Sequence, residues 1–120
     1  MTDPRIDQAV VEIGRRMGDG ITVADLARAA NLSQSRFAQL FHQQMGVSPG
    51  RYLRQRRLER ARLLLQSTFL TVRQVMTAVG FNDPSHFSRD FQCAFGASPR
   101  AWREHMARSH GQQPTAAKTD

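Results

Sequence analysis

The chain contains one pattern twice, and this internal repeat constrains its fold more than any other feature. Residues 22–53 (TVADLARAANLSQSRFAQLFHQQMGVSPGRYL) correspond to residues 71–103 (TVRQVMTAVGFNDPSHFSRDFQCAFGASPRAWR), with an offset of 49 positions that becomes 50 after one extra residue near Pro84. The identical pairs are Thr22/Thr71, Val23/Val72, Ala29/Ala78, Ser35/Ser85, Phe37/Phe87, Phe41/Phe91, Gly46/Gly96, Ser48/Ser98 and Pro49/Pro99. Each copy has the pattern of two short helices joined by a tight turn. The repeat therefore predicts two helix-turn-helix units.

Capping residues divide the chain into helices. Asp3-Pro4 is typical of an N-cap followed by a first helical residue, and Thr22 with Asp25 and Thr71 with Gln74 resemble capping boxes. Either Asn82 or Asp83 is expected to cap the helix that begins at Pro84. No segment alternates as a strand does. We therefore expect an all-α fold of about seven helices in a domain over residues 1–108, with these parts: a first helix-turn-helix at 22–46, a joining helix at 49–66, a second helix-turn-helix at 71–96, a last helix at 99–107 and a disordered C-terminal tail at 109–120.

Aromatic and aliphatic residues mark the core face of each unit. Phe37 and Phe41, and likewise Phe87 and Phe91, lie four residues apart and are expected to point inward. The core side of the joining helix is expected to carry Leu53, Leu58, Ala61 and Leu65. Stacks of paired helices also form solenoids, but these need about three or more units, and this chain has two.

The net charge of +7 points to a polyanionic partner. Nucleic acid is the first candidate and an acidic membrane surface the second. Of the 17 basic residues all but Lys118 are arginine, which fits either codon bias or the recognition of phosphates and guanine edges. The single cysteine, Cys93, excludes an internal disulfide and a cysteine metal site. The sequence has no long apolar run and no apolar signal core, so we expect a cytoplasmic protein with no membrane partner.

The helix faces opposite the phenylalanines carry side chains that can reach base edges. In the first unit these are Ser35, Arg36, Ala38, Gln39, Gln43 and, at the margin, His42; in the second they are Ser85, His86, Ser88, Arg89 and Gln92. An ordinary solvated face is the alternative for either helix alone. The joining helix adds six arginines against one acid, Glu59, and we expect Arg51 and Arg54, near its start, to contact phosphates.

These motifs together closely resemble the AraC/XylS family of bacterial transcription regulators. The residues that carry the resemblance are T-x-x-x-L-A from Thr22, S-x-S-x-F-x-x-x-F from Ser33, G-x-S-P at Gly46 and again at Gly96, G-F-x-D from Gly80 and F-S-R-x-F from Phe87. They cover about residues 5–107. The resemblance implies two helix-turn-helix subdomains bridged by one helix, with a recognition helix in each of two successive major grooves of double-stranded DNA.

Mapped position by position, the resemblance also implies the contacts. The base contacts are expected at Ser35, Ala38, Gln39, Ser85, His86, Ser88 and Arg89. Phosphate contacts are expected at Ser33, Arg36, Arg51, Arg54, Thr71 and Arg100. Ala38 offers only an apolar contact, for example to a thymine methyl group, and Pro84 replaces a polar reader of some relatives. Arg89 could bind guanine or a phosphate.

The family also implies a larger protein and its partners. We expect the chain to be the C-terminal half of an effector-responsive regulator rather than a stand-alone one. RNA polymerase and a second copy, held through a domain absent here, are the further partners implied. No cofactor, metal ligand or catalytic residue is expected. The alternatives are a protein-interaction or non-specific DNA- or RNA-binding module, and a DNA-repair alkyltransferase that uses Cys93. The second is disfavoured because Cys93 lies near a helix C-terminus.

Overall fold

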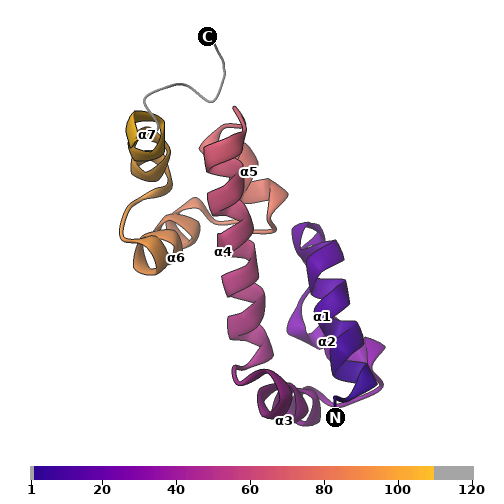
Figure 1. The fold of residues 1–120 in the computed structure, drawn as a ribbon. Helices are drawn as coiled ribbons and strands as arrows, with labels where there is room; N and C mark the ends of the chain where they lie inside the picture. Colours follow the sequence, from indigo (N-terminus) through magenta and orange to yellow (C-terminus); the bar gives the residue numbers. More distant parts are fainter. Residues whose placement is uncertain (1, 110–120) are drawn as a thin grey trace. The chain divides into compact units, whose positions relative to one another are not determined.

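Seven α-helices and one 3₁₀ turn make up the described part of the chain. The computed structural model describes residues 2–109. The elements are α1 (Pro4–Arg16), η1 (Met17–Asp19), α2 (Val23–Ala29), α3 (Gln34–Met45), α4 (Pro49–Ser67), α5 (Val72–Ala78), α6 (Pro84–Phe95) and α7 (Pro99–Ser109), as Figure 1 shows. Residues 2–109 contain no strand, so the expected all-α class is confirmed. The chain divides into two compact units, one ending at Arg57 and the other beginning at Leu58 within α4.

The N-terminal caps explain where the helices start. Asp3 accepts a hydrogen bond from the backbone N–H of Arg5, and the expected capping boxes of α2 and α5 are both present. Asp83, not Asn82, caps α6: its carboxylate accepts from the N–H groups of Ser85 and His86. These bonds satisfy amide groups that have no partner inside the helix.

Glycines end α3 and α6 in the same way. Gly46 after α3 and Gly96 after α6 have φ angles of +82° and +83°, a left-handed conformation that costs glycine little. Their N–H groups donate to the carbonyls of His42 and Gln92. The repeat in the sequence therefore reflects a repeated local structure.

Helix ends differ from the sequence prediction by one or two residues. α4 ends at Ser67 rather than residue 66, and α7 extends to Ser109 rather than residue 107. Helix ends fray, and the sequence carries no strong signal for the last residue of either α4 or α7. Residues 110–120, which contain most of the predicted tail, lie outside the described residues.

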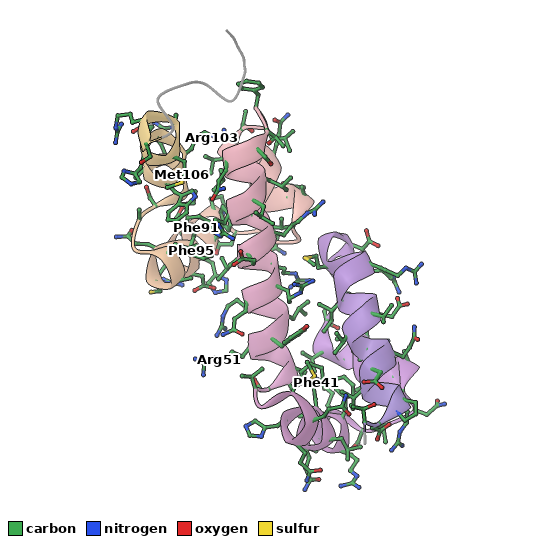
Figure 2. The ribbon with its side chains drawn as sticks, in the orientation of Figure 1. Phe41, Arg51, Phe91, Phe95, Arg103 and Met106 are labelled. Atoms are coloured by element: carbon green, nitrogen blue, oxygen red, sulfur yellow. The ribbon has the colours of Figure 1, made fainter. Side chains whose placement is uncertain are left out.

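Each unit has its own hydrophobic core. In the first unit Ile6, Ile13, Phe37 and Phe41 are fully buried, and Phe41 packs against Tyr52 where α3 meets the start of α4 (Figure 2). The inward orientation of the phenylalanine pair is confirmed.

In the second unit Phe87 and Phe91 are buried with Val75 and Val79, and an aromatic chain continues through Phe95. The four residues predicted for the core side of the joining helix are all buried: Leu53, Leu58, Ala61 and Leu65. Burial of these phenylalanines fixes which face of α3 and α6 remains at the surface.

Candidate nucleic-acid interface

In the first unit, the exposed face of α3 carries the predicted base contacts. Phe37 and Phe41 point into the core, which leaves Ser35 and Gln39 exposed and Ala38 partly exposed. The guanidinium of Arg36 donates to the amide oxygen of Gln39 over 3.0 Å. The amide nitrogen of Gln39 is therefore the group left to reach a base edge.

The predicted phosphate contacts of the first unit lie at two helix starts. Ser33 caps α3, and its hydroxyl accepts from the N–H of Arg36. Arg51 and Arg54 are exposed on the first turns of α4, and Arg51 projects outward from that helix (Figure 2). Ser48 caps this end of α4 by accepting from the N–H of Arg51.

In the second unit, the exposed face of α6 carries the predicted base contacts. Ser85, His86 and Arg89 are exposed and Ser88 is half-buried. The Nε2 atom of His86 lies 3.1 Å from a carboxylate oxygen of Asp90, one helical turn later. The structure thus adds Asp90, which the sequence analysis did not single out, to this face.

A cleft of about 550 Å³ in the second unit brings together residues from α5, α6 and α7. Three predicted contacts line it: Thr71, Ser88 and Arg100. Arg73 and Arg103 line it too, with Glu104 as the one acid. The cleft therefore gathers three arginines near the start of α5, and their positive charge favours an anion there.

Ion pairs separate the arginines into two groups. Carboxylates within residues 2–109 pair with Arg5, Arg15, Arg16, Arg28 and Arg62. All five arginines predicted to contact DNA belong to the other group, which has no carboxylate within 4.0 Å among the described residues: Arg36, Arg51, Arg54, Arg89 and Arg100. Their positive charge is therefore available to a polyanion.

Two further arginines donate to backbone carbonyls, a role that no pattern in the sequence indicates. Arg57 donates to the carbonyls of Met17 (3.2 Å) and Ile21 (2.8 Å). In the second unit Arg103 donates to the carbonyls of Leu65 (3.0 Å) and Thr68 (3.3 Å). Burial lowers the pKa of both guanidinium groups, although arginine stays charged in proteins. These arginines stabilise helix ends, and Arg103 does so at the edge of the cleft.

Three observations on the described residues concern the other chemistries considered. Cys93 is exposed near the end of α6. No three side chains of His, Cys, Asp or Glu within residues 2–109 lie together as metal ligands would. In the same residues, no helix combines the length and the apolar character needed to cross a membrane.

Comparison with known proteins identifies the family. A helix-turn-helix domain family matches residues 26–105. The chain is 42% identical over 101 residues to the transcriptional activator NphR of a Rhodococcus species, and 36% identical over 102 residues to the arabinose operon regulatory protein of Escherichia coli K12. The chain belongs to the AraC/XylS family. This AraC-type domain binds DNA for the regulation of transcription.

A solved structure agrees with this assignment. The DNA-binding domain of AdpA, crystallised in complex with a target DNA, superimposes with a TM-score of 0.85 at 25% identity, over 89% of this chain and 96% of that one. The two sequence relatives are longer. This chain is covered over 84% of its length in both matches but spans only 30% of NphR and 35% of the arabinose regulator.

Proposed function

We propose that this AraC-type domain binds one specific double-stranded DNA sequence, with α3 and α6 in successive major grooves. The observation that carries the proposal is the repeated face. Each unit buries its phenylalanine pair and exposes polar side chains on the opposite side of the same helix, including Gln39 in α3 and Arg89 in α6. A major groove admits one α-helix, and its base edges are read by side chains of these types.

The side chains that would contact bases differ between α3 and α6. Through its amide nitrogen, Gln39 would donate to a base acceptor, because Arg36 already occupies its oxygen. A bidentate contact to adenine would require Arg36 to release that oxygen. Ser35 and Ala38 would add a hydroxyl and a methyl contact. In α6, Arg89 would bind guanine O6 and N7 in two hydrogen bonds, with Ser85, His86 and Ser88 around it.

The phosphate contacts would position each helix in its groove. In the first unit Ser33, Arg36, Arg51 and Arg54 would take this role, and in the second unit Thr71 and Arg100. The cleft beside Thr71 supports one such contact, because it gathers Arg73, Arg100 and Arg103 at the start of α5. Contacts of this kind fix register and supply salt-dependent affinity without sequence information.

We also propose that the domain is the C-terminal, DNA-binding part of a longer effector-responsive regulator. The support is its length: it spans about a third of the two relatives it matches. The remainder of such a protein would bind the effector and hold two copies together. Contact with RNA polymerase would follow if the protein activates transcription, as the name of NphR states for that relative.

Affinity measured against salt separates this function from non-specific binding. A fluorescent duplex selected by the chain, a scrambled duplex of equal length and a single-stranded RNA are titrated over a range of salt concentrations. The proposal expects the selected duplex to bind about a thousandfold or more tightly than the scrambled one. Equal affinities for both duplexes, or tighter binding of the RNA, would instead establish a general nucleic-acid binder.

A further inference from the structure

The second recognition helix contains a histidine–aspartate pair that the first does not have. His86 and Asp90 lie one turn apart on α6, with Nε2 of the histidine 3.1 Å from Oδ2 of the aspartate. The aligned positions of α3 are occupied by Arg36 and Leu40. The pair is therefore a property of the second unit and not of the repeat.

The aspartate oxygen in this pair has no better partner. Oδ2 of Asp90 is shielded from solvent, and no donor within residues 2–109 is aligned with it as a hydrogen bond requires. The contact with His86 has the distance of a hydrogen bond without its full alignment, so it is chiefly electrostatic. A shielded carboxylate oxygen is costly unless a proton faces it. The Nε2 position of His86 is the available source of that proton.

This requirement selects one form of the imidazole. A neutral histidine carries a proton on one ring nitrogen and a lone pair on the other. If Nε2 carried the lone pair, its negative partial charge would lie 3.1 Å from a carboxylate oxygen, and the two would repel. The edge contact with Phe81, whose ring centre lies 6.1 Å from that of His86, further limits the orientation of the imidazole. The Nε2–H form is therefore favoured, which leaves Nδ1 as the acceptor.

We propose that Asp90 is a positioning residue that fixes His86 in the Nε2–H form and thereby decides which base His86 prefers. The inference rests on the proposed function, in which α6 lies in a major groove. There an acceptor pairs with the amino groups of cytosine and adenine, whereas guanine presents acceptors at O6 and N7 and thymine presents one at O4. His86 then favours cytosine or adenine at the position it faces. A guanine at that position would place its acceptors O6 and N7 opposite the acceptor Nδ1.

The form of the imidazole can be measured without DNA. Nitrogen-15 NMR of the full chain, recorded at a pH above which the imidazole resonances no longer change, reports which ring nitrogen of His86 carries the proton. The Nε2–H form is expected in the wild type. In Asp90→Asn the share of the Nδ1–H form should rise, because the carboxylate that opposes a lone pair on Nε2 is gone and the amide can also donate to Nε2. A wild-type ring with its proton on Nδ1 would overturn the proposal.

Asp83→Asn is the matched control. It removes one negative charge from the N-cap of α6, seven residues before Asp90, and asparagine caps helices about as well as aspartate. The Asp83 carboxylate bonds to the backbone N–H of His86 and not to its ring. This variant should therefore keep the wild-type imidazole form. If Asp83→Asn changes the form as much as Asp90→Asn does, the contact between Asp90 and the ring is not the cause.

Selection from a random duplex library tests the base preference itself. Relative to the wild type, Asp90→Asn should reduce the preference for cytosine or adenine at one position by about threefold to tenfold, the worth of one hydrogen bond. Asp83→Asn should leave it intact. His86→Ala should abolish the same preference, and adding Asp90→Asn to it should change nothing more.

Two results would overturn the base preference assigned to His86 and Asp90. One is an unchanged preference in Asp90→Asn, and the other is an unchanged preference in His86→Ala. A wild-type chain that selects no motif would overturn the proposed function and the readout by His86 together. The NMR experiment on the free chain distinguishes that failure, because it tests the positioning by Asp90 separately.

Discussion

Replacing Arg57 should lower the stability of the protein without removing any contact between the protein and DNA phosphates. Arg57→Met keeps the apolar stem and removes two hydrogen bonds, to the carbonyls of Met17 at 3.2 Å and Ile21 at 2.8 Å. Hydrogen bonds from a charged donor contribute about 1.5–3 kcal/mol each. The guanidinium is only partly buried, so water replaces part of this interaction in the variant. We therefore expect a loss of about 2–3 kcal/mol in the free energy of unfolding.

Arg54→Met on the same helix is the matched control. Arg54 is exposed and has no carboxylate within 4.0 Å among the described residues, so its loss should change stability by less than about 0.5 kcal/mol. It should instead reduce the slope of log affinity against log salt by about one unit, because one phosphate contact is lost. Urea unfolding followed by circular dichroism and salt titrations of a labelled duplex measure the two effects at a temperature where both variants are folded.

Two outcomes would refute the assignment of Arg57. Either Arg57→Met unfolds at the urea concentration of the wild type, or it lowers the salt slope as Arg54→Met does. The first result would mean that the two carbonyl bonds contribute nothing. The second would mean that Arg57 belongs to the phosphate contacts.

Further predictions concern the bases, the core and pH. Gln39→Ala and Arg89→Ala should each weaken binding to the selected duplex by about 1–3 kcal/mol and leave binding to a scrambled duplex unchanged; an unaltered ratio of the two affinities would remove either residue from the readers. Phe87→Ala should cost about 3–5 kcal/mol in urea unfolding because it opens a cavity at a buried site, and wild-type melting would contradict the packing. The backbone N–H and hydroxyl of Thr22, then Arg28, lower the pKa of Asp25. The stability from Asp25 is therefore lost as pH falls through its ordinary value of 3.8 and below, and Asp25→Asn should flatten that loss in urea midpoints measured against pH.

The repeat predicted most of the fold because it combined independent local signals. Thr22 with Asp25 predicted a helix start that the structure confirms with both bonds of the capping box. The spacing of Phe37 and Phe41 predicted the buried face of α3. These signals act within one or two turns of helix, so a sequence displays them directly.

The roles of Arg57 and Arg103 could not be predicted in the same way. Their acceptors are backbone carbonyls that lie 35 to 40 residues away along the chain, and every residue has such a carbonyl. In contrast, the pairing of His86 with Asp90 follows the helical spacing of four and was available in the sequence. The predicted base and phosphate contacts remain predictions, because an exposed polar side chain is the same in a solvated face and in a DNA-reading one.

The central claim is that two helices read two grooves of one duplex. Selection from a random duplex library with the wild type, Gln39→Ala and Arg89→Ala tests it most directly. We predict a wild-type motif of two short conserved blocks whose centres lie about one helical turn, roughly 34 Å, apart. Gln39→Ala should erase information in one block and Arg89→Ala in the other. A wild-type motif with a single block, or loss of the same block in both variants, would contradict two-groove readout.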